Sequence, residues 1–273
     1  MSRLIKLIYA YFGYLSMSAP IVNVEQLQKV YDNGTEALKS VTFEVKAGEI
    51  FGIIGVNGAG KTTLIRILTT MLRPTSGKIS VMGLNPAEEP EKVRSMIGVL
   101  PQETGLYEEF TIEENLQFIA EMQSVPKSER KQRIHKVADL LGISNRLDTR
   151  VDHLSGGLKQ RAMIARTLIG QPHILFLDEP TTGLDVLVAR RVRQIIKELS
   201  NDMTIFLATH NMHEAYQLCT KVGIIKEGSI LMIDSPNSIM QQNGESGDDF
   251  EDVIAKILGI DDPEYSLNHL EVD

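Results

Sequence analysis

The stretch Gly55-Val56-Asn57-Gly58-Ala59-Gly60-Lys61-Thr62-Thr63 decides the fold of this chain. It matches the pattern G-x-x-x-x-G-K-[ST], a phosphate-binding loop that is meaningful only between a buried strand and a helix. The apolar run Ile50-Phe51-Gly52-Ile53-Ile54 precedes it, and four apolar residues follow it at helical spacing: Leu64, Ile67, Leu68 and Met71. The sequence therefore predicts a central parallel strand, a phosphate-binding loop and a helix, in that order.

The residue types in this loop suit a bound phosphate chain. Glycines let the backbone bend so that successive N–H groups converge on phosphate oxygens, and the positive end of the following helix favours the same anion. Lys61 should reach the β- and γ-phosphates, and the Thr62 hydroxyl should ligate Mg²⁺. The predicted nucleotide-binding residues of the loop are Gly55, Asn57, Gly58, Ala59, Gly60, Lys61, Thr62 and Thr63. The alternative is a glycine-rich turn with a solvated lysine.

A nucleotide site of this kind also needs an acidic partner at the tip of another buried strand, because Mg²⁺ prefers hard oxygen ligands. The segment His173-Ile174-Leu175-Phe176-Leu177-Asp178-Glu179 supplies two. We expect Asp178 to hold the metal and Glu179 to activate the attacking water as general base. The alternative is a pair of surface acids that end a strand.

A second glycine-rich string, Leu154-Ser155-Gly156-Gly157-Leu158-Lys159-Gln160-Arg161, lies about a hundred residues further on. The pattern L-S-G-G-x-x-Q-R should arise by chance in a chain of this length with a probability of about 10⁻⁵. Ser155 is a good N-cap residue, and an apolar helical face follows it. A capped surface helix would explain Ser155 but not the glycine pair with Gln160-Arg161. One nucleotide site needs only one such cradle, so we expect another subunit to complete each site.

With these motifs in place, the chain resembles the nucleotide-binding subunits of ATP-binding cassette (ABC) proteins, from about Val24 to Ile239. The resemblance implies a role for four further residues. Tyr31 matches the aromatic residue that stacks on adenine, and Gln102 matches the glutamine that contacts Mg²⁺ or water. Asp185 matches the loop that crosses a dimer interface, and His210 matches the histidine that contacts the γ-phosphate. An ordinary strand-end tyrosine and a turn histidine are the alternatives for Tyr31 and His210.

The same resemblance implies the architecture and the partners. The implied fold is α/β, a P-loop NTPase with a RecA-like parallel core sheet, an antiparallel β subdomain and a helical signature subdomain. Two subunits, expected to be a homodimer, pack head to tail around two ATP molecules with Mg²⁺, and separate integral membrane permease subunits complete the transporter. The residues expected to reach the partner's nucleotide are Ser155, Gly156, Gly157, Gln160 and Asp185. Val56, Val186 and Leu158 depart from the usual residues of these loops, which puts loop rigidity in doubt rather than chemistry.

The chain divides into three parts on sequence grounds. Residues 1–19 are an extension, with Met17 as the expected natural start, and residues 20–240 are the ATPase domain with its helical subdomain at about 103–170. Strand-like runs at 21–24, 41–45 and 78–81 fit an antiparallel sheet. Residues 241–273 are an acidic tail with one amphipathic helix. That helix either docks on its own domain, which the pattern favours, or binds a partner.

The composition fits a subunit that associates with membrane proteins but does not itself span the membrane. No stretch approaches the ~20 apolar residues that a membrane-spanning helix needs, so a transporter requires other membrane subunits. The net charge of the chain is −8, while the segment from residue 245 onward carries ten acids and one lysine. The remainder is nearly neutral, and no nucleic-acid partner is expected. The single cysteine, Cys219, excludes an internal disulfide. We expect a cytoplasmic location on the inner face of the membrane.

The branch of the family is the least constrained prediction. Segments such as Pro74-Thr75-Ser76-Gly77 and Met212-His213-Glu214-Ala215 look most like the drug- or ion-exporting branch. An importer subunit is the closest rival, because its catalytic core is the same. A soluble cassette ATPase of translation or DNA repair would need a second cassette, a coiled-coil insertion or metal-binding cysteines. A non-hydrolysing regulatory subunit would lack Glu179 or His210.

Overall fold

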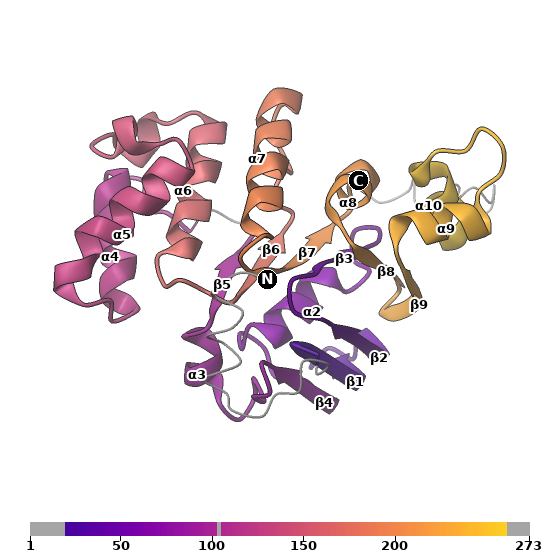
Figure 1. Cartoon of the computed structure of the whole chain (residues 1–273). Coiled ribbons are helices and arrows are strands. Elements are labelled where there is room, and N and C mark those ends of the chain that lie inside the picture. Colours follow the sequence, from indigo (N-terminus) through magenta and orange to yellow (C-terminus); the bar gives the residue numbers. More distant parts are fainter. Residues whose placement is uncertain (1–19, 103–104, 261–273) are drawn as a thin grey trace.

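A computed structural model describes residues 20–102 and 105–260 of the chain. Two β-sheets lie side by side, a lobe of three helices flanks one end, and two short helices close the other (Figure 1). The predicted N-terminal extension, with its start at Met17, lies outside the described residues, as does the tail beyond Ile260.

The smaller sheet is antiparallel, as predicted, with strand order β2-β1-β4. Its strands are β1 (Val22–Val30), β2 (Glu36–Val45) and β4 (Ser76–Val81). The predicted run at 21–24 covers only the start of β1. Register shifts after Val24 and a positive φ of 49° at Gln26 break the alternation of apolar and polar residues, and this bulge hid the second half of the strand.

The larger sheet has the order β5-β6-β7-β3-β8-β9, and its first five strands are parallel. They are β5 (Ile97–Leu100), β6 (Ile174–Asp178), β7 (Thr204–Thr209), β3 (Ile50–Ile54) and β8 (Lys221–Lys226), followed by the antiparallel edge strand β9 (Ser229–Asp234). Every residue of β3, β6 and β7 is buried, as expected for central parallel strands. Their carboxyl ends meet at one edge, which brings the predicted motifs together.

Nine α-helices connect and flank these strands within the described residues. They are α2 (Lys61–Leu68), α3 (Pro90–Arg94), α4 (Ile112–Met122), α5 (Lys127–Leu140), α6 (Gly156–Leu168), α7 (Val186–Leu199), α8 (Met212–Leu218), α9 (Pro236–Asn243) and α10 (Phe250–Leu258). One sequence prediction is wrong. Met71 does not lie on the buried face of α2, because the helix ends at Leu68 and the Met71 side chain is 61% exposed.

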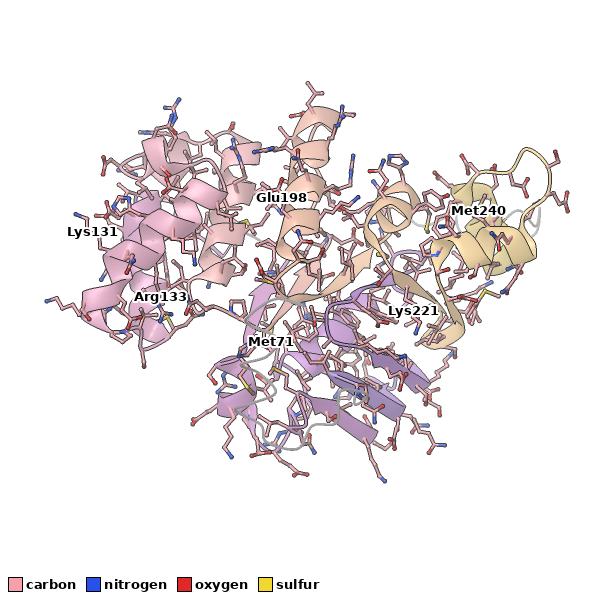
Figure 2. All side chains as sticks on the ribbon, viewed as in Figure 1. Met71, Lys131, Arg133, Glu198, Lys221 and Met240 are labelled. Atoms are coloured by element: carbon pink, nitrogen blue, oxygen red, sulfur yellow. The ribbon has the colours of Figure 1, made fainter. Side chains whose placement is uncertain are left out.

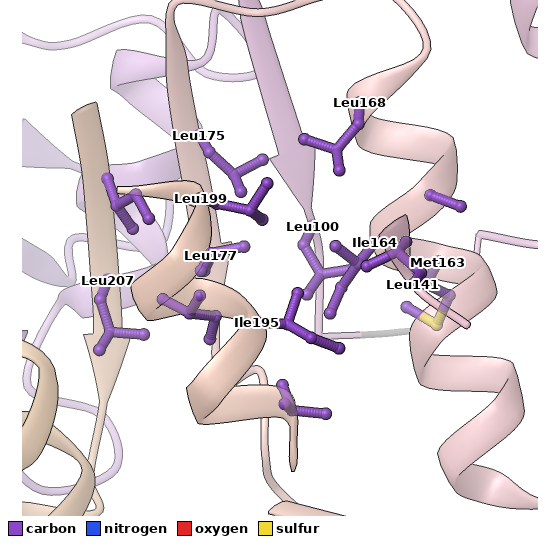
Figure 3. Close-up of a cluster of buried hydrophobic side chains, with 14 of the residues drawn as sticks. Leu100, Leu141, Met163, Ile164, Leu168, Leu175, Leu177, Ile195, Leu199 and Leu207 are labelled. Carbon is purple, nitrogen blue, oxygen red and sulfur yellow. The ribbon is translucent and has the colours of Figure 1, made fainter. Parts of the chain in front are cut away.

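Apolar contacts join the helical lobe to the sheet. Leu141 follows α5, and Ile164 and Leu168 belong to α6; they lie in one buried cluster with Leu100 of β5 and Leu175 of β6 (Figure 3). A second cluster lies between the two sheets around α2. Dense packing of this kind transmits small displacements between the elements that it joins. The lobe is therefore mechanically linked to the strands that carry the site.

The C-terminal helix α10 docks on the rest of the chain, which is the outcome that the sequence favoured. Val253 and Ile254 are fully buried, and the rings of Tyr216 in α8 and Phe250 lie 5.2 Å apart. Gly259 ends the helix with a φ of 65°. In the part of the chain that the structure describes, no helix has the length and apolar character to cross a bilayer.

Candidate nucleotide site

The phosphate-binding loop joins β3 to α2, and its glycines serve two different needs. Gly55 and Gly60 are required for space: a Cβ on Gly55 would collide with the carbonyl oxygen of Ile225, and one on Gly60 would lie 2.6 Å from that of Ala37. Gly58 faces open space but adopts a φ of 78°, which side chains with a Cβ rarely adopt. The loop backbone is therefore fixed against β2 and β8 with its outer side free.

Lys61 is buried at the start of α2 and holds the loop closed. Its Nζ donates to the carbonyl oxygens of Gly55 at 2.7 Å and Val56 at 3.1 Å, and it lies 3.7 Å from Oε1 of Glu179. Burial lowers the pKa of Lys61, an effect that the neighbouring carboxylates Glu179 and Asp178 partly offset. A buried ammonium so close to the loop can exchange its carbonyl acceptors for phosphate oxygens.

Asp178 ends β6 beside the first turn of α2. Its side chain interacts with the Thr62 hydroxyl, and its Oδ1 is buried without a hydrogen-bond partner among the described residues. Burial is the main cause that raises the pKa of this carboxyl. An unpartnered buried oxygen beside a hydroxyl suits a hard divalent cation, because the cation would supply the missing charge. Thr62 and Asp178 thus fit Mg²⁺.

Glu179 is the centre of the site. Its Oε2 accepts from the Thr182 hydroxyl at 3.1 Å and lies 2.8 Å from Nδ1 of His210, which follows β7. The backbone of Glu179 has a φ of 54°, a left-handed conformation that is costly for a residue with a Cβ. Its N–H donates to the carbonyl of Ala208 at 2.9 Å. Such strain persists only where the surroundings fix it, and it aims the carboxylate at the loop.

Tyr31 lies at the end of β1, next to the first turn of α2. Its hydroxyl is 3.1 Å from Oγ1 of Thr63, and Nζ of Lys29 lies 5.3 Å from the centre of its ring. The ring is half-buried. It is therefore anchored at its hydroxyl and retains ring surface that a base could stack on.

The signature turn occupies the N-terminus of α6 in the helical lobe. Ser155 takes the N-cap position but its exposed hydroxyl makes no capping hydrogen bond, and Gly156 is also exposed. Gly157 is buried instead, since an added Cβ would lie 2.7 Å from Val188 of α7. Gln160 donates to the carbonyl of Pro180 at 2.5 Å. The turn thus contacts the segment after Glu179 through Gln160 and presents Ser155 outward.

The remaining predicted residues lie around this centre. Gln102 is exposed just after β5 and has no side-chain hydrogen bond among the described residues. Asp185 caps α7 by accepting from the N–H groups of Leu187 and Val188 at 3.1 and 3.0 Å. Leu187 itself is 77% exposed and adjoins Val186, which is 79% exposed. An apolar pair this exposed marks a surface available to another molecule.

Sequence reasoning missed two polar residues that the structure places at the site. Thr182 donates to Glu179, and Glu214 is completely buried in α8 and accepts from Thr181. Burial raises the pKa of the Glu214 carboxyl. The position of Glu214 four residues after His210 was visible, but no sequence pattern indicates that a helical glutamate faces inward.

A groove of about 900 Å³ separates the helical lobe from the nucleotide-binding core. Met71 after α2 and Arg133 of α5, both labelled in Figure 2, line it from the two sides. Arg94, Met122 and Arg166 contribute further charge and apolar surface. The groove begins beside Pro101, so it adjoins the segment that carries Gln102.

Fold and site together define a P-loop nucleotide hydrolase: a parallel sheet whose carboxyl edge carries a glycine-rich loop at a helix N-terminus, a buried carboxylate that fits a divalent cation, and a buried glutamate beside a histidine. A family model described as "ABC transporter" matches residues 38–182, slightly more than half of the chain. The chain belongs to the ATP-binding subunits of the ABC transporter family. The family binds ATP with Mg²⁺ for its hydrolysis, which confirms the predicted class of enzyme and its cofactors.

Two relatives differ in what their names say. The methionine import ATP-binding protein MetN of Geobacillus kaustophilus is 38% identical over 77% of this chain. This chain spans 64% of that relative's length. The linearmycin resistance ATP-binding protein LnrL of Bacillus subtilis is 33% identical over 82% of this chain and 72% of its own length. The family is thus shown, while the direction of transport differs between the two names.

Solved structures of similar proteins share the fold. CbiO1 of Clostridium perfringens, described as part of the ABC transporter complex CbiONQ, has a TM-score of 0.76 and 29% identity over 92% of this chain and 98% of its own. The ATP-binding cassette MJ0796, solved as a post-hydrolysis dimer with ADP and phosphate, has a TM-score of 0.71 and 27% identity over 78% of this chain and 98% of its own. These neighbours confirm the predicted P-loop α/β fold.

Proposed function

We propose that this chain is the ATP-hydrolysing subunit of an exporter, in which two copies close around two ATP molecules and drive separate membrane permease subunits. The observation that carries the proposal is the position of Glu179. Its carboxylate lies between Lys61, which belongs to the phosphate loop, and His210. A carboxylate held there by two neighbours can accept a proton from a water that attacks the γ-phosphate.

In this mechanism the loop and Lys61 bind the phosphates, and Tyr31 stacks on adenine. Mg²⁺, when bound, would be held by Thr62, Asp178 and Gln102 and would neutralise phosphate charge. Glu179 takes the proton from water, and His210 orients Glu179 and the γ-phosphate.

The exposed signature turn supports the dimer. Ser155 and Gly156 are free of contacts that would prevent them from meeting a second molecule's γ-phosphate, and the exposed pair Val186 and Leu187 adjoins Asp185. ATP would join the two chains through charge-assisted hydrogen bonds that are lost on hydrolysis. That loss distinguishes a closed from an open dimer, as an energy-coupled switch requires.

The groove between lobe and core is the proposed contact for the permease subunits. Three arginines, two methionines and Glu91 are among its lining residues, and the groove adjoins Gln102, which could report the state of the nucleotide. This docking would hold the chain at the inner face of the membrane. The resistance protein among the relatives favours export, and the methionine import protein favours the alternative, an importer. The membrane subunit that co-purifies with the tagged chain from its own cells tests the direction: a solute-binding-protein-dependent permease would overturn export.

The substitution Glu179→Gln tests the catalytic core of the proposal. It should slow ATP hydrolysis by roughly 10²- to 10⁴-fold, about 3 to 5 kcal/mol of barrier, because the amide cannot accept the proton. ATP binding should persist, and size-exclusion chromatography with ATP and Mg²⁺ should show a trapped dimer. Glu198→Gln, the same change on the exposed surface of α7, should leave hydrolysis and oligomeric state unchanged. Near-normal single-turnover hydrolysis by Glu179→Gln would exclude Glu179 as the base.

A further inference from the structure

A further buried carboxyl, beyond Asp178 and Glu179, lies behind the site and has no role in the proposed mechanism. Glu214 of α8 is 0% exposed, although glutamate is almost never fully buried without a partner. Its Oε1 accepts from the Thr181 hydroxyl at 2.9 Å, and its Oε2 is buried without a hydrogen-bond partner among the described residues. A fully buried carboxyl with one unsatisfied oxygen is unfavourable for folding, which calls for a reason for its presence.

The neighbours of this carboxyl come from both catalytic segments. Thr181 lies two residues after Glu179, in the segment that follows β6. Thr209, the residue before His210, ends β7, and its hydroxyl lies near enough to the Glu214 carboxyl to lower the pKa of that carboxyl. The backbone N–H of Glu214 donates to Oδ1 of Asn211, the N-cap residue of α8, at 2.9 Å. A single side chain therefore bridges the segment that carries Glu179 and the segment that carries His210.

Glu179 needs such a support on its C-terminal side. Its left-handed backbone is fixed on the N-terminal side by β6 and by its own N–H bond to Ala208. Beyond it the chain turns sharply; Gln160 donates to the carbonyl of Pro180, and the Thr181–Glu214 hydrogen bond that follows is the first one in the turn that is fully buried. Strained residues persist where surrounding contacts over-determine them. Without this bond, the turn has more freedom to move the carboxylate relative to His210.

A third element, α7, places a charged residue near the Glu214 carboxyl. The positive charge of Arg193 in α7 lowers the pKa of Glu214, while the negative charge of Glu179 raises it. The Nε of Arg193 is itself buried without a hydrogen-bond partner among the described residues. Glu214 thus lies where α7, α8 and the two catalytic segments converge.

We propose that Glu214 is a positioning residue for ATP hydrolysis, which fixes Glu179 relative to His210 by holding Thr181 and Thr209. The inference rests on the proposed function, in which Glu179 is the base. It does not assign Glu214 any contact with ATP. The hydrogen bond that Glu214 accepts, rather than its charge, performs the positioning.

Steady-state hydrolysis and ATP affinity, measured on the full chain, separate this role from a structural one. Glu214→Ala should lower kcat by about 10- to 100-fold, because a displacement of about 1 Å at a catalytic group costs that much. The Kd for a fluorescent ATP analogue should stay within about threefold, since no phosphate contact is lost. Glu214→Gln should keep kcat within about threefold of wild type, because its amide oxygen still accepts from Thr181.

The Thr181→Val variant provides a second test that does not depend on how well Glu214→Ala folds. It should lower kcat by roughly tenfold. The double variant Thr181→Val/Glu214→Ala should be no slower than Glu214→Ala, because each single substitution already removes the same Thr181–Glu214 hydrogen bond. Thr204→Val is the matched control: it removes a buried threonine hydroxyl at the opposite end of β7, which accepts from Gly48, and should leave kcat unchanged.

Several outcomes would overturn the proposal. A kcat within about threefold of wild type for folded Glu214→Ala or for Thr181→Val would do so. Equal loss in Glu214→Gln and Glu214→Ala would do so too, because it would assign the effect to charge. Glu179→Gln in the same assay separates the two hypotheses. If it abolishes hydrolysis while Glu214→Ala does not, only the positioning role fails; if it retains hydrolysis, the proposed base fails.

Discussion

The phosphate loop and the signature turn are both glycine-rich and both open a helix, yet the structure treats them differently. The phosphate loop is closed by its own chain: Gly60 lies against the carbonyl of Ala37, and Lys61 donates to two loop carbonyls. The signature turn is open, with Ser155 exposed and its hydroxyl free of a capping bond. One cradle is assembled within the chain, and the other presents its polar groups outward.

This difference assigns the two motifs different requirements. A preassembled cradle pays little ordering cost when phosphate binds, so we expect the phosphate loop to bind ATP in the isolated chain. The signature turn has the donors of an anion site at a helix N-terminus, but Ser155 and Gly156 are exposed and the Ser155 side chain makes no capping hydrogen bond among the described residues. Its function should therefore depend on a second copy, and its fold should not.

Complementation between two inactive variants is the largest expected effect that follows. Lys61→Ala and Ser155→Ala should each lower hydrolysis by roughly 10²-fold, because each removes a preorganised donor from the γ-phosphate. In an equal mixture of the two variants, half of the dimers contain one copy of each, and one of the two sites in such a dimer is intact. About a quarter of all sites should therefore be complete, compared with all sites in wild type. Hydrolysis rates across a titration of one variant into the other measure this.

The double variant Lys61→Ala/Ser155→Ala is the control for the mixing experiment. Mixed with either single variant, it leaves no site with both an intact loop and an intact signature turn, so hydrolysis should stay low. Recovery in that mixture, or none between the single variants, would contradict a site shared head to tail.

Replacing three glycines by alanine, one at a time, should show that the phosphate loop and the signature turn contribute differently to the free energy of unfolding. Gly60→Ala should lower the free energy of unfolding by about 3 kcal/mol, because its Cβ would collide with the carbonyl of Ala37 at a φ of 109°. Gly58→Ala should cost about 1 to 2 kcal/mol from backbone strain alone. Gly156→Ala should change stability by no more than about 0.5 kcal/mol, since its Cβ would approach only Leu184, at 4.0 Å.

Urea denaturation of the three variants gives these values. The Gly156→Ala variant should have the same free energy of unfolding as wild type but should hydrolyse ATP more slowly than wild type. If it destabilises the chain as much as Gly60→Ala, the signature turn is part of the folded core and the contrast between the cradles is lost.

The sequence predicts most strongly where a motif and a periodicity coincide. The run Ile50–Ile54 is β3 residue for residue, and the order of the central motifs follows from the parallel sheet that such runs form. Thr111 is the N-cap of α4, and the string Thr111-Ile112-Glu113-Glu114 matches the S/T-x-x-E pattern of the capping box that the structure shows. These features are local, so neighbouring residues suffice to predict them.

Features that depend on distant contacts were not predictable. Met71 keeps the helical spacing of an apolar face, but α2 has already ended at Leu68. Gly157 is needed for its contact with Val188, thirty-one residues away, rather than for exposure. Glu214 looks like an ordinary helical glutamate until α7 and α8 enclose it. The roles predicted for the residues that bind nucleotide stay predictions, to be tested by the variants above.

The N-caps of α4 and α6 in the lobe provide the smallest expected effect and a direct test of the open turn. The Thr111 hydroxyl accepts from the N–H of Glu114 at 3.1 Å, whereas the Ser155 side chain accepts no capping hydrogen bond at the same position of α6. Thr111→Ala should therefore lower the free energy of unfolding by about 1 kcal/mol, and Ser155→Ala by no more than a few tenths. An equal loss in both would mean that Ser155 caps α6 in solution and is not held free for a partner.

The two caps should also differ in their response to pH. Hydrogen bonds from the backbone and side chain of Thr111 lower the pKa of Glu114 below its ordinary value of 4.5. A carboxyl whose pKa is depressed in the folded state stabilises the fold above its ordinary pKa, and this contribution is lost as the pH falls. The stability advantage of wild type over Glu114→Gln should thus be largest near about pH 7 and shrink below about pH 4.

The third residue of α6 is Leu158, so the signature helix has no such group, and Leu158→Ala should shift stability equally at both pH values. A pH-independent difference for Glu114→Gln would show that the capping carboxylate is not engaged and that both caps of the lobe are open.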